Sequence, residues 1–196
     1  MNLIAFRFQN LFIYLIPAAL VSGPFLPDLF AVIASIIFII LSVRNKEWYY
    51  YKQPIFIIFL IWCIYILVRS LFSSDPVFSL ESSLFYFRFG FLSLAIWYAI
   101  DKNPNFIKIF TWIVTVTFII VLIDGYIQYF TGHNLTGFSV FYQTDRGIGE
   151  IHRLSGFFNE QLILGSYLSR LLPLVFALIT LKYSNSKTII ILNMIL

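Results

Sequence analysis

The sequence predicts an all-α fold, a polytopic transmembrane helix bundle with six full spans and a truncated seventh. Of the 196 residues, 60% are hydrophobic and 20% are aromatic, whereas only 11% are charged. A soluble domain usually has about 25% charged residues, and the mean hydropathy of +0.89 points away from that class. The apolar residues also gather into runs near the length of about 20 residues that a helix needs to cross a bilayer. We therefore expect an integral membrane protein.

Six apolar runs qualify as spans. In chain order they cover residues 3–22, 28–43, 54–72, 82–100, 107–130 and 161–181, and residues 131–160 form the longest connection. A seventh run starts at Thr188 and stops at Leu196, the last residue. As a helix it would rise only about 14 Å, which is too short to cross a membrane. We expect residues 1–196 to be the N-terminal part of one longer multi-span membrane domain.

The first run is expected to remain as a helix rather than to be cleaved as a signal peptide. Arg7 precedes the apolar stretch, but no small-residue cleavage site follows it. Gly23, Pro24 and Pro27 instead predict a tight turn that leads into the second run.

The lysines and arginines of the connections predict the orientation of the chain. The connections 23–27 and 73–81 contain neither residue, whereas the alternate connections are basic and hold Arg44, Lys46 and Lys52, then Lys102 and Lys108, then Lys182 and Lys187. We therefore expect a cytoplasmic N-terminus and an outer loop at 131–160. Because the basic residues are scattered between apolar runs, the net charge of +4 does not indicate nucleic-acid binding.

The cations in or above the outer half of the expected membrane are all arginines: Arg69, Arg88, Arg146, Arg153 and Arg170. An arginine near the bilayer centre costs about 2.5–3.5 kcal/mol on insertion scales, so it needs a partner or a watery cavity. Arg69 lies near the end of its span and could reach the interface, and Arg88 or Arg170 could form a structural ion pair with Asp124. Alternatively, these arginines form an outward-opening pocket for an anionic ligand, since a guanidinium stays charged when desolvated and binds phosphate through two parallel hydrogen bonds.

The 131–160 loop is the most polar and glycine-rich part of the chain, as is typical of loops that carry function. His133 and His152 are 19 residues apart without a nearby cysteine. This spacing is poor for zinc ligands, so we expect no metal site. The run Asn134-Leu135-Thr136 fits a glycosylation sequon, which is a short pattern of low specificity.

Four stretches carry a resemblance that covers nearly the whole chain. They are GPFLPD, RSLFSSDPVFSLESSLFYFRFG, DGYIQYFTGHNLTGF and RLSGFFNEQLILGSYLSRLLPL. In their order, spacing and topology these stretches resemble the bacterial O-antigen ligase and O-antigen polymerase type of membrane protein. The resemblance implies a glycosyltransferase of the bacterial inner (plasma) membrane, active in cell-surface polysaccharide and lipopolysaccharide biosynthesis. Such an enzyme moves a glycan from an undecaprenyl-diphosphate carrier onto the lipid A core (a ligase) or onto another carrier-linked glycan (a polymerase).

The resemblance also implies roles for particular residues. Arg88 and Arg153 match arginine positions of the family, which implies that they bind the diphosphate, and Arg170 and Arg69 are further diphosphate-binding candidates. The candidates for supporting roles are Asp124, Gln128, Gly156 and Asn159. The family needs no cofactor or metal, and its catalytic residues would lie beyond Leu196, so we expect residues 1–196 alone to be inactive. The chain departs from the family at Asn159-Glu160-Gln161, where an Asn-Pro-Asn-like run is common.

Two alternatives remain open at the level of the sequence. The first is whether the enzyme is a ligase or a polymerase, which no residue of the chain distinguishes. The second is a transporter of an anionic or lipid-linked substrate in place of an enzyme. A transporter of this kind would carry substrate-lining charges on both sides of the membrane midplane, whereas here they gather in the outer half.

Overall fold

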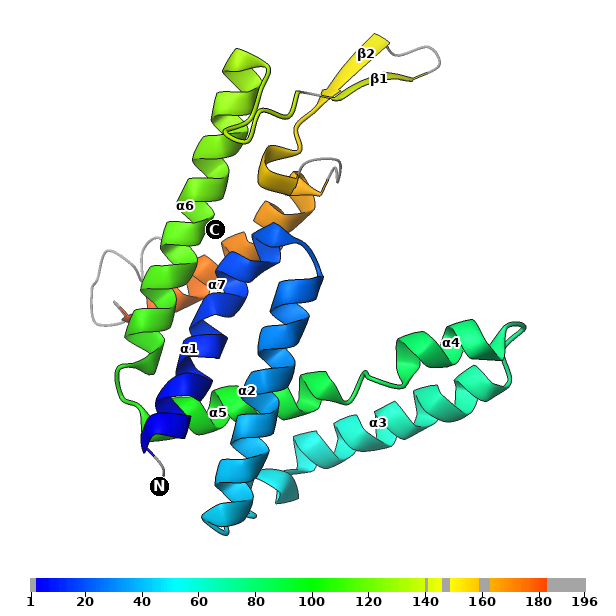
Figure 1. The fold of residues 1–196 in the computed structure, drawn as a ribbon, viewed down its shortest axis with the longest axis vertical. Helices are drawn as coiled ribbons and strands as arrows, with labels where there is room; N and C mark the ends of the chain where they lie inside the picture. The colour runs from blue at the N-terminus through cyan, green and yellow to red at the C-terminus, as the bar shows by residue number, and fades with distance from the viewer. Residues whose placement is uncertain (1–2, 140, 146–148, 159–162, 183–196) are drawn as a thin grey trace. The chain divides into compact units, whose positions relative to one another are not determined.

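The computed structural model describes residues 3–139, 141–145, 149–158 and 163–182, and its elements are shown in Figure 1. The helices are α1 (Leu3–Ala19), α2 (Phe25–Arg44), α3 (Pro54–Leu71), α4 (Pro76–Ser83), α5 (Arg88–Lys102), α6 (Phe106–Thr131) and α7 (Leu164–Lys182). Short 3₁₀ turns lie at Leu20–Ser22 (η1), Tyr50–Lys52 (η2) and Gly156–Phe158 (η3), and two strands at Phe141–Asp145 (β1) and Gly149–Arg153 (β2). The chain divides into two compact units, Met1–Ile16 with Phe25–Phe106, and Pro17–Pro24 with Ile107–Leu196.

The helices confirm the expected all-α membrane fold. Five segments among the described residues are long and apolar enough to cross a bilayer: Leu3–Ser22, Phe25–Arg44, Pro54–Leu71, Pro76–Lys102 and Phe106–Thr131. The sixth expected span corresponds to α7, whose apolar part, Leu164–Thr180, is shorter. A helix suits this environment because it satisfies its backbone hydrogen bonds within the segment, where lipid offers no partners. The expected seventh run, 188–196, lies outside the described residues.

In the first unit, α2 lies beside α5 and α3 beside α4 (Figure 1). The side chain of Gln9 on α1 donates from Nε2 to the carbonyl oxygen of Ala95 on α5 at 2.9 Å. Tyr98 of α5 is fully buried and makes edge-on ring contacts with Phe6 and Phe38. These aromatic contacts and one buried hydrogen bond join α1, α2 and α5 into the core of this unit.

The expected span 82–100 lies within Pro76–Lys102, which is long and apolar enough to cross a bilayer, but its helix is interrupted between α4 and α5. Asp75 caps α4 by accepting a hydrogen bond from the amide of Phe78, and Pro76 occupies the first turn, where its missing N–H costs nothing. At the break, the amide of Tyr86 donates to the carbonyl of Ser83, a shorter-range bond than an α-helix makes. The two helices differ in their main partners, since α4 lies against α3, whereas α5 lies mainly against α2 and also contacts α3. The break lets each of them face its own partner.

The Tyr50–Lys52 turn anchors the loop between α2 and α3 to the end of α5. Tyr50 is buried, and its hydroxyl donates to Oδ2 of Asp101 at 3.0 Å. Burial, followed by this hydrogen bond, raises the pKa of Tyr50, so the phenol stays protonated and remains a donor. Lys102 Nζ lies 2.7 Å from Glu47 Oε1 in the same region.

In the second unit, α6 packs along α7 through two apolar clusters. One contains Val114, Val175 and Leu178. The other contains Val121, Phe158 and Leu164, with Val21 and Tyr167 packed against it. Through the second cluster, the turns η1 and η3 join the two helices.

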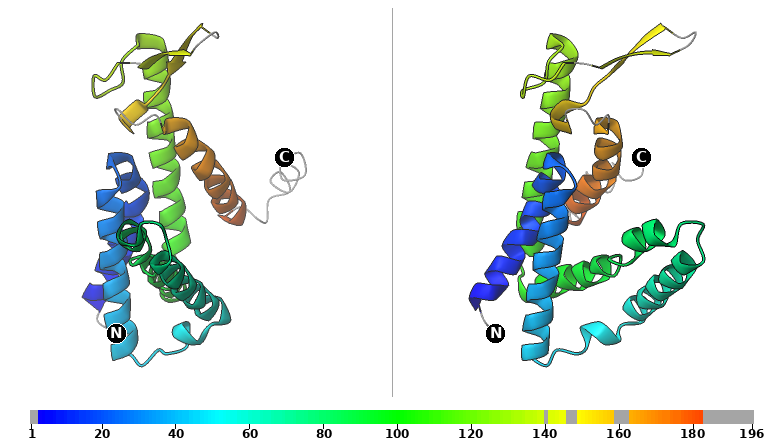
Figure 2. Two further views of the ribbon diagram at one scale, coloured as in Figure 1. Left: turned by 90° about the vertical axis from the view of Figure 1, so that its right-hand side faces the viewer. Right: turned by 45° about the vertical axis from the view of Figure 1, so that its right-hand side comes forward.

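The 131–160 loop contains a β-hairpin, which the sequence analysis did not predict. Strands β1 and β2 pair antiparallel, with Phe141 opposite Arg153 and Asp145 opposite Gly149 (Figure 2). A two-stranded hairpin is marginal alone in water. Here it continues directly into Ser155 and Gly156, which are anchored on α6, as described below.

Candidate functional site

A groove of about 440 Å³ in the second unit contains one of the expected arginines, Arg170. Most of the wall is apolar, and the lining residues are Leu20, Gly23, Pro24, Phe158, Ile163, Ser166, Tyr167, Arg170 and Leu171. They come from η1 and the turn after it, from η3, and from α7 and the residue before it. The groove therefore combines three segments of the unit that are distant in the sequence.

Among the described residues that line this groove, Arg170 alone carries a charge, and its side chain is exposed. Within the described residues it makes no ion pair, because the salt bridges found there join other residues. An arginine among apolar side chains is costly in a membrane unless an acidic residue or another anion compensates its charge. An anion bound in the groove would supply that compensation.

Tyr167 closes one side of the groove. Its ring packs on Phe158 with 5.0 Å between the ring centroids, and its hydroxyl donates to the carbonyl oxygen of Pro17 at 3.1 Å. This bond ties α7 to the end of α1, and the ring contact ties α7 to η3. The sequence analysis missed Tyr167, because a tyrosine inside an apolar run does not indicate its partners.

A buried polar network beside η3 is centred on Gln128 of α6. Gln128 is fully buried, and its Oε1 accepts hydrogen bonds from the amides of Ser155 and Gly156 at 2.9 and 2.8 Å. Its Nε2 donates to Ser155 Oγ at 3.2 Å and to the carbonyl oxygen of Phe138 at 3.4 Å. A single glutamine therefore fixes both the start of η3 and the loop that follows α6.

Asn134 anchors the same loop from its other side. Its Oδ1 accepts hydrogen bonds from the amides of Thr136 and Phe138, at 3.0 and 2.7 Å, and its Nδ2 donates to the carbonyl oxygen of Gly156. Asn134 is buried with all of these bonds made. The signal that could have found this role is an asparagine followed closely by Gly137, since Asn and Gly mark turns in which the Asn side chain bonds the backbone.

Asp124 lies one helical turn before Gln128 and is also fully buried. Its Oδ1 accepts a hydrogen bond from the amide of Leu135 at 2.9 Å, whereas its Oδ2 has no hydrogen-bond partner among the described residues. Gly156 adopts φ +55°, and a Cβ at this position would lie 3.1 Å from that Oδ2. Glycine is thus favoured here both by the backbone conformation and by the close approach to Asp124.

Five of the expected site residues that the structure describes belong to the second unit. Asp124, Gln128 and Gly156 belong to the polar network, and Arg170 lies in the groove that shares η3 with it. Arg153 is the last residue of β2, where its backbone pairs with Phe141, two residues before the anchored Ser155. Asn159 lies outside the described residues.

The other two expected arginines belong to the first unit. Arg88 is the first residue of α5, and its Nη2 lies 2.8 Å from Oδ2 of Asp28 on α2. The alternative of an ion pair between Arg88 and Asp124 is therefore wrong: the partner is Asp28, and Asp124 accepts from a backbone amide instead. The Arg88 guanidinium also lies 4.9 Å from the centroid of the Phe89 ring. Arg69 is exposed in the last turn of α3.

No group of three or more metal-binding side chains occurs in the described part of the chain. Comparison with protein families, with curated proteins and with solved structures finds no match to this chain.

Proposed function

We propose that this protein acts in glycan transfer from a polyprenyl-diphosphate carrier, at the outer face of the bacterial inner membrane. The acceptor would be the lipid A core or another carrier-linked glycan, as in the ligases and polymerases that the sequence resembles. The observation that carries the proposal is Arg170, a guanidinium without an acidic partner among the described residues, in an otherwise mostly apolar groove.

The groove has the two properties that a polyprenyl diphosphate needs. Apolar walls suit the prenyl chain, because burying apolar surface is favourable in proportion to its area. The guanidinium suits the diphosphate, because it donates two parallel charge-assisted hydrogen bonds and stays ionised when desolvated. Other amphiphiles with a phosphate share this chemistry, and the experiment below separates them.

In this proposal the arginine contributes to rate as well as to binding. Glycosyl transfer leaves the diphosphate as the leaving group, so negative charge grows on it in the transition state. A cation held in a site of low dielectric stabilises that charge more than it stabilises the substrate, which lowers the barrier.

The polar network would position the segment that carries Arg153. Gln128 and Asn134 hold Ser155 and Gly156, so the strand end two residues earlier is attached to α6 at a fixed point. Arg88 would act differently, because a diphosphate at that position would have to compete with Asp28.

The experiment measures binding of undecaprenyl diphosphate to the full chain in lipid nanodiscs, with undecaprenyl phosphate and undecaprenol as comparison ligands. We expect the diphosphate to bind more tightly than the alcohol, and Arg170→Gln to remove most of that difference. Arg170→Lys should retain part of it, because lysine keeps the charge but loses the two-pronged geometry. Arg44→Gln, at an exposed arginine that ends α2, is the matched control and should bind as the unaltered chain does. Equal binding of diphosphate and alcohol would contradict the proposal.

A second measurement separates transfer from transport. Deletion of the gene in its source bacterium should leave carrier-linked glycan on the outer face of the inner membrane, because the glycan is no longer transferred to an acceptor. Accumulation on the cytoplasmic face would instead indicate that the protein moves the carrier, and would reject the transferase.

A further inference from the structure

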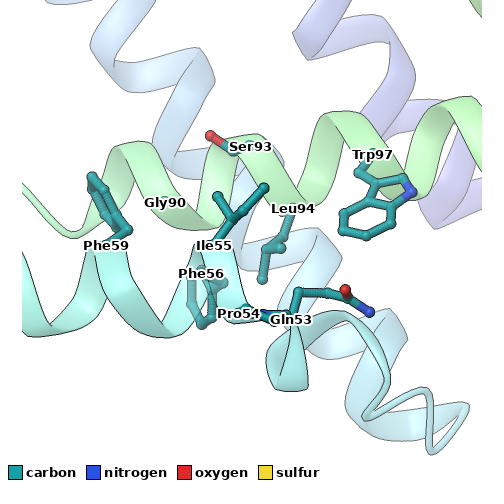
Figure 3. Close-up of a pocket in the computed structure, with 9 residues that line it drawn as sticks. All are labelled: Gln53, Pro54, Ile55, Phe56, Phe59, Gly90, Ser93, Leu94 and Trp97. Carbon is teal, nitrogen blue, oxygen red and sulfur yellow. The ribbon is translucent and has the colours of Figure 1, made fainter.

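A second pocket lies in the first unit, between the beginning of α3 and α5, and has a volume of about 370 Å³ (Figure 3). Its wall is almost wholly apolar, and among the residues that line it are Pro54, Ile55, Phe56, Phe59, Leu94 and Trp97. Ile55 is 83% exposed, so the pocket is reachable from outside the protein. Its volume is in the range of small-molecule sites in proteins.

Close contact between the two helices forms one side of this pocket. A Cβ at Gly90 of α5 would lie 2.5 Å from a ring carbon of Phe59 on α3. Glycine therefore allows the phenylalanine to press against the backbone of α5. Nearer the start of α3, the helices are separated enough to leave the space between Pro54, Leu94 and Trp97.

Basic residues outnumber acidic residues at the end of the unit that contains this pocket. Four basic residues belong to this end of the unit, Arg44, Lys46, Lys52 and Lys102, against two acidic residues, Glu47 and Asp101. Both acids are engaged, Glu47 by Lys102 and Asp101 by the Tyr50 hydroxyl.

Lys52 is the cation closest in sequence to the pocket, directly before Gln53, which lines it. Its side chain is exposed and makes no ion pair within the described residues. Trp48 and Tyr49, in the same loop, are exposed aromatic residues of the kind that lie at the headgroup level of a membrane.

We propose that this pocket binds an anionic phospholipid, with one acyl chain among the apolar side chains and the phosphate beside Lys52. The apolar wall fits the acyl chain, and the exposed cation of Lys52 fits the headgroup. Phe59 lies about 8 Å along α3 from Pro54, so the pocket would take the part of the acyl chain next to the headgroup. This site is independent of the Arg170 groove and of the proposed glycan transfer, because it uses other residues in the other unit.

Trp97 provides the measurement, because it lines the pocket and bromine on a lipid chain quenches tryptophan fluorescence at short range. A chain with Trp97 as its only tryptophan carries Trp48→Phe, Trp62→Phe and Trp112→Phe, at positions that are 50%, 43% and 67% exposed. It is reconstituted in vesicles of phosphatidylglycerol and phosphatidylcholine in equal amounts. Two vesicle preparations are compared. The anionic lipid is brominated in one and the zwitterionic lipid in the other, and in both the bromine lies on the acyl chain near the headgroup.

We expect Trp97 to be quenched more strongly when the anionic lipid carries the bromine. Lys52→Gln should lower the preference for the anionic lipid by about fivefold, the contribution of one lysine near an anionic headgroup. Lys108→Gln is the charge control at an exposed lysine of α6 and should leave the preference unchanged.

A chain with Trp62 as its only tryptophan is the position control, because Trp62 lies ten residues beyond Lys52 on α3 and does not line the pocket. It should be quenched equally by both brominated lipids. Equal quenching of Trp97 by the two lipids would overturn the headgroup assignment. Absence of quenching by either would show that protein rather than lipid covers the pocket, and would also overturn the proposal.

Discussion

The two units of this chain differ in the ion pairs and the buried polar groups that they contain. The first unit contains two ion pairs that remain partly exposed: the side chains of Arg88 and Asp28 are 30% and 42% exposed, and those of Lys102 and Glu47 are 35% and 24% exposed. The second unit buries Gln128, Asn134 and Asp124, which bond to backbone atoms of the loop, and it leaves Arg170 without an ion-pair partner among the described residues.

This difference indicates which groups hold the fold and which remain available for a ligand. A partly exposed ion pair contributes little to stability, whereas a buried backbone amide that loses its acceptor costs its full desolvation. We therefore expect the neutral network to dominate the stability effects, and the unpaired arginine to have almost none. Four predictions test this order.

The largest effect is expected for Gln128→Leu. The leucine has nearly the same size but leaves the amides of Ser155 and Gly156 without their acceptor in a buried site. The free energy of unfolding should fall by about 3 kcal/mol, as each buried unsatisfied group costs about 1–3 kcal/mol. Unfolding by sodium dodecyl sulfate in mixed micelles measures it. Gln53→Leu is the control, because Gln53 is not buried and makes one long bond of 3.4 Å, and its effect should be small.

Gly156→Ala should have the next largest effect. Alanine at φ +55° is strained, and its Cβ would lie 3.1 Å from Asp124 Oδ2, so we expect a loss of about 2 kcal/mol in the same unfolding assay. Gly165→Ala, in the first turn of α7 with nothing within 4 Å of its Cβ, should instead be neutral or slightly stabilising. Equal losses for both glycines would show that Gly156 has no special role.

The ion pair of the first unit should give a small coupling. A double-mutant cycle of Asp28→Asn and Arg88→Gln is expected to yield about 0.5 kcal/mol, since both side chains are partly exposed. The cycle of Glu47→Gln and Lys102→Gln is the matched comparison and should give a similar value. A coupling above that of the Gln128 network would reverse the contrast between the units.

The smallest effect on stability is expected for Arg170→Gln. With an exposed side chain and no ion pair among the described residues, its loss should change the free energy of unfolding by less than about 0.5 kcal/mol. The same variant should lose most of its preference for the diphosphate ligand. A large loss of stability would identify Arg170 as a structural residue and remove the reason to place an anion beside it.

The sequence by itself determined the class of fold and the approximate course of the chain. Long apolar runs, interrupted by Gly, Pro and charged residues, dictate membrane-spanning helices, because only a helix satisfies its own backbone in lipid. The sequence also indicated Asp124, from its charge within an apolar run, and Gln128 and Gly156, through a resemblance, but it did not specify their contacts.

Only the tertiary structure decided which polar groups meet. The break between α4 and α5 depends on two helices that face different partners, and a hydropathy pattern does not contain that information. The pairing of Arg88 with Asp28 rather than Asp124 joins residues 60 positions apart. The anchoring of Ser155 and Gly156 by Gln128 spans 27 and 28 positions. Contacts at such separations follow from how helices pack in space, so periodicity and composition, which are local, identify the polar residues but not their partners.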